Sequence, residues 1–501
     1  LSGMAMMEIL DLSHNKLFGE IPQSLTELSF LSSFDVSYNE LHREIPEKGQ
    51  FDTFPLTSFE GNRGLYRCSA SGFMPSPPDE TPAQPHHQKL QIIDFPFWFG
   101  SLAGILITIG MYFASGWNFT SSPNDLKALI GFSRCLESAI PDWNSSTSSD
   151  YCTWSGVTCV GTRVVRLELG STQLTGKICE SLACLDQLRV LKLSKNLFTG
   201  SLPHSLFHLP NLEIMDFSNN QFEGSIDTTM CSSFTQLRVF KLSSNYFSES
   251  IFLLQNLNEL YLQDNKLSRP LSEGVGKLSN LLEFDISNNE FSGILPNIFG
   301  GLTRLKVFYA GSNRFTGPLP ASLVNSVSLQ MLNLKINSLA ATLEVLSHCK
   351  NLSTLVLTNN FHNEEMPQAQ GQNLEFSNLK VFVLANSQIK GSIPKWLSGC
   401  KMLQMLDLSW NHLSGGIPPW IGKLNNLYYL DLSNNSFTGR IPQSFTMFLS
   451  LQPNNSSLEG TLFAFPFDTV ETGTLKRMKY EKLSNLRPSL LLSYKGFILN
   501  E

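Results

Sequence analysis

The sequence predicts an α/β repeat solenoid, in which short parallel strands are stacked through most of the chain and joined by irregular or 3-10 turns. Two observations lead to this fold class. The segment from Leu406 to Pro418 recurs from Leu430 to Pro442, so that Asn411 and Asn435 stand 24 positions apart. Within each copy, leucines alternate with variable residues, which is typical of a strand with one buried face.

An asparagine at the same phase marks the other repeats, with Thr172 and Ser387 in its place in two of them. It occurs at Asn15, Asn39, Asn196, Asn220, Asn245, Asn265, Asn289, Asn313, Asn337 and Asn360. The pattern LxLxxNxLxGxIP at this period is that of plant-type leucine-rich repeats. We expect the asparagine side chain to bond backbone groups where the chain leaves the strand. Stacking then gives a curved sheet whose concave face displays the variable residues.

Two repeats are irregular. Asn245 and Asn265 are only 20 positions apart, and the Gly-x-Ile-Pro segment is absent after Leu339. Either the solenoid tolerates these repeats, or a deletion or a mis-spliced exon has removed part of them. The spacing alone leaves both explanations open.

The chain divides into segments whose order is unusual, because a C-terminal cap precedes an N-terminal cap. From Phe95 to Ala114 no charged residue occurs, so this stretch can be a signal peptide or a membrane anchor; a buried helix is the less favoured reading. We hypothesise a read-through of two tandem receptor genes.

The segments are 1–70, two repeats and a C-terminal cap; 71–91, a Pro-rich linker; 92–115, the apolar segment; 120–160, an N-terminal helical cap; 161–451, about twelve repeats; 452–488, an island insertion; and 489–501, the start of another repeat.

Composition and motifs exclude several classes of function. Charged residues make up 16% of the chain and the net charge is −6, which argues against a nucleic-acid partner. No Gly-rich loop with its lysine, no H-R-D and no D-F-G is present, so we predict no enzyme activity, no cofactor and no metal. The glycosylation sequons permit a secretory location, and they begin at Asn118, Asn144, Asn351, Asn434, Asn454 and Asn455.

The chain resembles the phytosulfokine receptor kinases of plants. The residues that carry this resemblance are Asp125–Cys159, Val164–Leu169, His348–Leu352, Leu355–Thr358, Leu406–Trp410, Phe51–Phe54 and Ser58–Glu60. The element C-x-W-x-G-V-x-C is similar to the family's N-terminal cap and implies a disulfide between Cys152 and Cys159. The other cysteines of this block are expected to be buried small hydrophobic residues, namely Cys135, Cys179, Cys184, Cys231, Cys349 and Cys400.

The resemblance also implies a location and partners. It implies a plasma-membrane protein with extracellular repeats, a sulfated peptide hormone bound on the concave face beside the island, and a co-receptor kinase with a short leucine-rich-repeat ectodomain. The family's peptide contacts correspond to Thr358, Asn386, Asp407 and Trp410 of this sequence, and the island adds Phe465 and Phe467. We further expect Arg314 to pair with the sulfate, because a guanidinium matches oxyanion geometry.

Two departures from the family pattern limit what carries over. Asp468-Thr469-Val470 stands where the family has an aromatic and then a basic residue, and Tyr66 replaces a cysteine, which leaves Cys68 without its usual partner. Two alternatives therefore remain beside a peptide receptor. One is a receptor-like or secreted defence protein without a kinase, which recognises a microbial ligand or enzyme, and the other is a non-functional fusion product.

Overall fold

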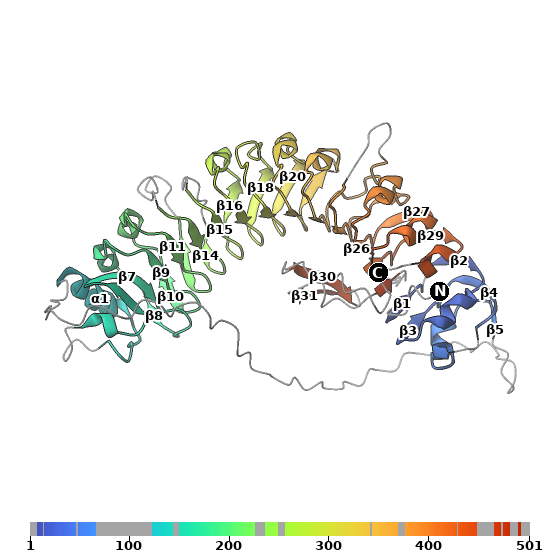
Figure 1. Ribbon diagram of the computed structural model, residues 1–501, viewed down its shortest axis with the longest axis horizontal. Helices are drawn as coiled ribbons and strands as arrows, with labels where there is room; N and C mark the ends of the chain where they lie inside the picture. Colours follow the sequence, from blue (N-terminus) through green and yellow to red (C-terminus); the bar gives the residue numbers. More distant parts are fainter. Residues whose placement is uncertain are drawn as a thin grey trace, which may run out of the picture. The chain divides into compact units, whose positions relative to one another are not determined.

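The computed structural model places most of the chain in one compact unit, which combines Leu1–Arg67 with Ser121–Glu501. The predicted linker 71–91 and the apolar segment 92–115 lie outside the described residues. The structure describes residues 8–66 and 123–447, except for 14, 47–48, 144–149, 226–235, 249–255, 341–342, 369–375 and 428, together with three later strands at 465–471, 474–480 and 489–491 (Figure 1).

A 16-stranded sheet, called the main sheet below, forms the framework of this unit. Its neighbouring strands are parallel, apart from the antiparallel first pair at the N-terminal cap. In sheet order the strands are β3 (Ser33–Asp35), β1 (Ile9–Asp11), β32 (Ser489–Leu491), β28 (Tyr429–Asp431), β26 (Met405–Asp407), β24 (Val381–Val383), β23 (Thr354–Val356), β21 (Met331–Asn333), β19 (Val307–Tyr309), β17 (Glu283–Asp285), β15 (Glu259–Tyr261), β13 (Val239–Lys241), β11 (Ile214–Asp216), β9 (Val190–Lys192), β7 (Arg163–Glu168) and β6 (Val157–Val160). The predicted solenoid of short parallel strands is confirmed.

A second set of strands follows the asparagine position and forms three smaller sheets, called the flank sheets. The first contains β8 (Thr175–Gly176), β10 (Leu197–Gly200), β12 (Gln221–Gly224) and β14 (Tyr246–Phe247); the second contains β16 (Ser268–Pro270), β18 (Glu290–Ile294), β20 (Arg314–Pro318) and β22 (Ser338–Ala340); the third contains β25 (Lys390–Gly391), β27 (His412–Gly416), β29 (Ser436–Gly439), β2 (Lys16–Gly19), β4 (Glu40–Glu44) and β5 (Gly64–Tyr66).

The flank sheets are interrupted at the two irregular repeats, whereas the main sheet is not. The first break falls between β14 and β16, in the repeat with the 20-residue spacing, and the second falls after β22. In the main sheet, β13 still pairs with β15 and β21 with β23. Both irregular repeats therefore interrupt the pairing on the flank and leave the pairing of the main sheet intact.

Short 3-10 helices complete the coils, and several follow a proline, whose fixed φ suits the start of such a turn. They are η2 (Gln23–Glu27), η3 (Gly49–Asp52), η4 (Leu56–Phe59), η5 (Tyr151–Thr153), η6 (Glu180–Cys184), η7 (His204–His208), η9 (Glu273–Lys277), η10 (Ala321–Asn325), η11 (Leu343–His348), η12 (Lys395–Gly399), η13 (Pro419–Lys423) and η14 (Gln443–Met447).

Each repeated asparagine bonds backbone groups of two successive coils. The Nδ2 of Asn411 donates to the carbonyl oxygens of Leu408 at 2.9 Å and Leu384 at 2.8 Å, and its Oδ1 accepts from the backbone N–H of Ile389 at 3.1 Å. The preceding residue, Trp410, has a φ of 55° and turns the chain off the strand. The buried asparagine thus pairs backbone groups of both coils within the core, as the sequence predicts.

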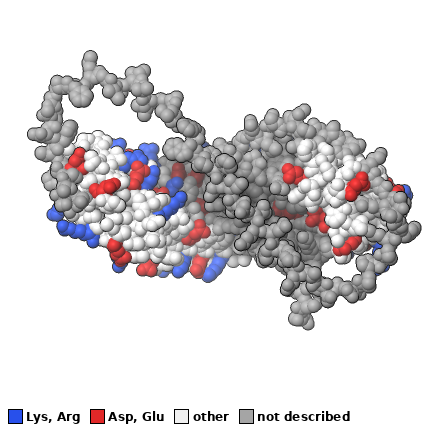
Figure 2. Space-filling model, turned by 90° about the horizontal axis from the view of Figure 1, so that it is seen from below, with Lys and Arg blue, Asp and Glu red and all other residues white. Residues whose placement is uncertain are grey.

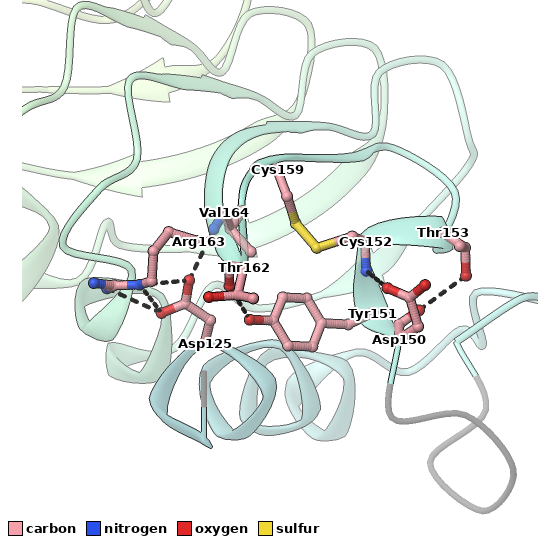
Figure 3. Close-up of a disulfide and its surroundings, with 9 residues drawn as sticks. All are labelled: Asp125, Asp150, Tyr151, Cys152, Thr153, Cys159, Thr162, Arg163 and Val164. Atoms are coloured by element: carbon pink, nitrogen blue, oxygen red, sulfur yellow. Dashed lines mark hydrogen bonds and ion pairs between the residues drawn. A yellow bond between two sulfur atoms is a disulfide. The ribbon is translucent and has the colours of Figure 1, made fainter. Parts of the chain in front are cut away.

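The N-terminal cap is fixed by a buried carboxylate and a disulfide (Figure 3). Asp125, near the start of helix α1 (Pro123–Cys135), accepts from the backbone N–H of Val164 at 2.8 Å and from Nε of Arg163 at 3.2 Å. The disulfide joins Cys152 to Cys159, the pair that the resemblance implies. Together these contacts attach the cap to β7, the first repeat strand.

A second disulfide corrects the prediction for two other cysteines. Cys135, at the end of α1, is bonded to Cys179, 44 residues later. The backbone N–H of Lys177 donates to the carbonyl oxygen of Cys135, so the two segments were already adjacent. The prediction also fails for Cys184, which is exposed.

Cys349 and Cys400 do behave as buried hydrophobic residues. Burial raises the pKa of the Cys349 thiol to about 11 and that of Cys400 to about 12. Both side chains are therefore neutral thiols within the core. Cys231 lies outside the described residues.

The first block of the chain continues the sheet of the second block. β32 pairs with β28 on one side and with β1 on the other, and β2 pairs directly with β29 in the flank sheet (Figure 1). The sequence suggests two partial solenoids in an unnatural order, but the structure joins them into one. The order of coils in space is a permutation of their order in the chain.

Beyond the repeats, β30 (Phe465–Glu471) and β31 (Thr474–Tyr480) form an antiparallel hairpin within the predicted island 452–488. Among the described residues, no helix has the length and apolar character needed to cross a membrane.

Candidate ligand-binding face

The strand face is the face of the main sheet that presents the first and third residues of each three-residue strand. The middle residue points to the core, as Leu406 does in β26 and Leu430 in β28, and both are fully buried. Equivalent positions of neighbouring strands pair with one another, so Val383, Asp407 and Asp431 lie side by side on successive strands. Variable residues of neighbouring repeats therefore form continuous rows.

The strand face of β9 to β17, called the front half, is polar and half-exposed. Its half-exposed charged residues are Lys192, Asp216, Lys241, Glu259, Glu283 and Asp285. In the left part of Figure 2, basic and acidic side chains are interspersed over the described surface and form no broad patch of one sign. On such a mixed surface, charged side chains of opposite sign form local pairs, each of which contributes little to stability.

Several of these pairs are centred on Tyr261, which sequence analysis did not single out. Its hydroxyl donates to Glu283, and Lys241 Nζ lies 4.6 Å from the centroid of its ring and 3.6 Å from Glu259 Oε2. Burial and the bond to Glu283 raise the pKa of Tyr261 above its ordinary value. Their positions in the sequence could have identified these residues, because each occupies an outward position of an LxL segment.

The strand face of β19 to β28, called the rear half, is largely apolar and buried. Met331 and Val381 are both 0% exposed although they point away from the core. The Tyr309 hydroxyl lies 2.6 Å from the sulfur of Met331, on the same face. The other buried residues on this face are Val307, Asn333, Thr354, Val356, Val383, Met405, Tyr429 and Asp431.

Three of the predicted peptide contacts lie together at the end of the rear half. Asn386 and Trp410 hold the same position in successive coils, each with a left-handed φ, and Asp407 lies on β26 between them. The backbone N–H of Asn386 donates to Ser409 at 2.9 Å, directly beside Trp410. Thr358 belongs to the preceding coil and its side chain is buried.

The carboxylate of Asp407 is already engaged by its own coil. Its Oδ1 accepts from the backbone N–H of Ser409 at 2.9 Å and from the hydroxyl of Ser409 at 2.6 Å. Burial raises its pKa above the ordinary value, and burial together with Asp407 raises the pKa of the neighbouring Asp431 well above it. Asp407 therefore shapes the turn at least as directly as it offers an acceptor to a ligand.

Arg314 does not belong to this group. It lies on β20 in a flank sheet, where its Nη2 forms an ion pair with Glu290 Oε2 at 2.9 Å. The residue after the repeated asparagine starts the flank strand, and for that reason it cannot contribute to the strand face. The sulfate contact by Arg314 stays a prediction, from a residue that lies on a flank sheet and not on the strand face.

The remaining predicted residues vary in what the structure shows. Phe465 and Phe467 lie on β30, in register with Tyr480 and Met478 of β31. Asn351 is exposed, with its Nδ2 donating to the carbonyl oxygen of Val327 at 2.7 Å. Asn434 is only 8% exposed, which argues against a glycan there. The sequons at Asn118, Asn144, Asn454 and Asn455 lie outside the described residues.

Comparison with known proteins agrees with this architecture. A leucine-rich repeat region model matches residues 218–433, a leucine rich repeat N-terminal domain model matches 122–160, and further leucine-rich-repeat models match 186–247, 6–28 and 426–448. Phytosulfokine receptor 1 of Arabidopsis thaliana is 36% identical over an alignment that covers 60% of this chain and 43% of that protein. The chain is built from leucine-rich repeats and is similar to plant leucine-rich-repeat receptors. It spans less than half the length of this curated relative.

Two solved structures of plant leucine-rich-repeat proteins are similar to this chain. The crystal structure of PEPR1-AtPEP1 matches with a TM-score of 0.57 and 28% identity, covering 64% of this chain and 50% of the other. The ectodomain of the membrane receptor kinase GASSHO1/SCHENGEN3 from Arabidopsis thaliana, in complex with CASPARIAN STRIP INTEGRITY FACTOR 2, matches with a TM-score of 0.53 and 28% identity, covering 64% and 46%. The matched family models of this chain are all leucine-rich-repeat models.

Proposed function

We propose that this chain is a ligand-binding ectodomain that faces the extracellular side of the plasma membrane and takes a sulfated peptide on the rear half of its strand face. The observation that carries the proposal is the position of Asn386, Asp407 and Trp410 on neighbouring coils, at the edge of an apolar stretch of sheet. An aromatic plane and an amide beside an apolar surface suit an extended peptide, which offers backbone polar groups and side chains alternately.

The island is proposed to complete this site. Met331, Val381 and Met405 point away from the core and are nevertheless buried, whereas Ile214 and Val239 at the same position in the front half are half-exposed. A non-repeat segment such as 452–488, which contains a hairpin and three phenylalanines, is a suitable cover for that surface. The peptide would then lie between the hairpin and the coils of β24 and β26.

Direct binding measurements test the proposal. We expect the full chain to bind a tyrosine-sulfated pentapeptide more tightly than its unsulfated form in isothermal titration calorimetry. Trp410→Ala should weaken binding by roughly tenfold or more, because it removes an aromatic anchor. Trp420→Ala is the matched control, since Trp420 lies on η13 in the same coil and away from the strand face.

Two further results bear on the assignment. Arg314→Ala should leave the affinity unchanged, because Arg314 is paired with Glu290 on the flank. A correctly folded chain that binds neither peptide would reject the proposal. It would favour a kinase-less defence receptor, for which pull-down against wall-degrading enzymes is the direct assay. Recruitment of a co-receptor kinase by the peptide-bound chain is a separate proposal, to be tested only after binding is established.

A further inference from the structure

The two blocks of the chain meet at an interface that is built from backbone pairing and apolar side chains. In the flank sheet, Lys16 pairs with Thr438 and Leu17 with Gly439. In the main sheet, Leu10 and Leu430 lie on either side of Leu490 of β32. In the flank sheet the interface pairs like two ordinary repeats, whereas in the main sheet β32 adds one strand between β28 and β1.

The end of the second block requires a cover of this kind. The last coil of a solenoid exposes its apolar edge and its unpaired strand unless something closes it. Phe437 in the coil of β28 and β29 is only 1% exposed, and on the other side of the junction Leu17 is 0% exposed. Each block thus buries the edge of the other.

The opposite edge of the first block is already closed by its own cap. The backbone N–H groups of Val36 and Tyr38 donate to Ser58 at 2.8 Å and to Glu60 at 2.7 Å, where the next strand of a longer array would pair. Phe34 packs against Phe51 with ring centroids 4.7 Å apart. The first block therefore has one open edge, on the side of β1 and β2, and one closed edge.

We infer that residues 1–67 form a detachable module, which docks non-covalently on the coil Tyr429–Phe445 and on β32 of the same chain. The partner of this coil edge is thus the N-terminal block, supplied in cis. The segment between the blocks, 68–120, does not restrict the docking, since a chain of that length reaches roughly 170 Å when extended. Two coils and a cap have too small a core to be stable alone, so the module folds fully only on this edge.

Engineered cysteines test the docking in the intact chain. Lys16 and Thr438 are exposed and directly paired, so their Cα atoms are about 5 Å apart, within the range for a disulfide. The double variant Lys16→Cys/Thr438→Cys should form this bond spontaneously and run as a monomer on a non-reducing gel. In the control Lys16→Cys/Gly416→Cys, the second cysteine lies one strand further away, at about 10 Å, and should not react.

A nicked chain tests whether the docking is non-covalent. With a protease site inserted in 76–88 and cleaved, the two pieces should co-elute in size-exclusion chromatography. Phe437→Ala should raise their dissociation constant by roughly tenfold or more, because it leaves a cavity at the junction. Phe315→Ala, at the equivalent position of an interior coil, should destabilise the array without releasing the module.

Three outcomes would overturn the inference. They are equal cross-linking in both cysteine pairs, a cross-linked dimer in place of a monomer, and separation of the wild-type pieces while circular dichroism shows the large piece folded. Peptide binding plays no part in these measurements, so they stand apart from the proposed receptor function.

Discussion

The front and rear halves of the strand face share one core but differ in the charge and burial of many outward residues. In the front half, charged and aromatic residues such as Lys241, Tyr261 and Glu283 bond one another across strands and stay half-exposed. In the rear half, residues such as Met331 and Val381 are apolar and buried. The leucines and asparagines fix the fold in both halves, so the outward positions are free to specialise. The contrast indicates that the rear half is the part built to be covered.

The largest difference between the two halves is expected when a charge is placed at matched positions of each. Val381 and Val239 are both first residues of their strands, but Val381 is buried and Val239 half-exposed. Val381→Asp should lower the free energy of unfolding by about 3 kcal/mol or more, because an unpaired carboxylate loses its hydration. Val239→Asp should cost less than about 1 kcal/mol. Urea denaturation compares them, and equal losses would mean that the rear half is accessible to water.

A smaller effect is expected from the hydroxyl of Tyr261. Tyr261→Phe leaves the ring in place but removes the donor to Glu283, which should cost about 1 kcal/mol. Tyr309→Phe is the counterpart in the rear half, and its loss should be smaller because a thioether sulfur is a weak acceptor. Thermal melts of both variants give the comparison. A larger loss for Tyr309→Phe would contradict the view that polar bonds matter more in the front half.

The carboxylate of Asp431 predicts a dependence of stability on pH. Its pKa is raised in the folded state by burial and by Asp407, so ionisation opposes folding at neutral pH. Stability should therefore rise as the pH falls through this raised pKa, and the gain is complete below the pKa of the unfolded chain. Asp431→Asn should raise the melting temperature at pH 7.5 by a few degrees at most, with no gain near pH 4.

Asp216→Asn provides the control for this experiment. Asp216 makes the same two hydrogen bonds with its serine, Ser218, but lies half-exposed in the front half. A pH-dependent gain of equal size in both variants would exclude the neighbouring carboxylate as the cause.

The smallest effect concerns Glu168 at the beginning of the array. Arg166, at 2.9 Å, and then Lys192, also at 2.9 Å, lower its pKa to about 2. The stabilisation is therefore present above the pKa of the unfolded chain and is lost as the pH falls toward 2. Both cations are more than a third exposed, so solvent screens the pairs and Glu168→Gln should cost less than about 0.5 kcal/mol at pH 7. The same loss in 1 M salt would show that charge is not its origin.

Much of this fold could be predicted because it is local. The LxL alternation and the asparagine phase specify each coil from its own residues, and the hydrogen bonds of Asn411 are those that the position requires. The side of the solenoid on which Arg314 lies could not be predicted, because the repeat pattern does not show that the residue after the asparagine begins a second strand on the flank. The Cys135–Cys179 bond was missed for a different reason, since it depends on packing of the cap helix against a later coil.

The joining of the two blocks could not be predicted from the repeats for a related reason. Any two plant-type coils have compatible edges, so periodicity leaves their order in space undetermined. The pairing of Leu17 with Gly439 is a tertiary contact between segments at opposite ends of the sequence. The rear half was likewise only partly foreseen. The resemblance predicts Asn386 and Trp410 as peptide contacts, whereas the burial of Met331 depends on what covers it and could not be predicted.

The pairing of β1 with β32 has a mechanical consequence. These are parallel neighbours, one close to the first described residue and the other close to the last. A force that pulls the start of β1 away from the end of β32 runs along both strands in opposite directions. It loads the hydrogen bonds between them together, in shear, where a peeling force would break them one at a time. Tension applied between these two points would therefore be resisted first by the strands that unite the two blocks.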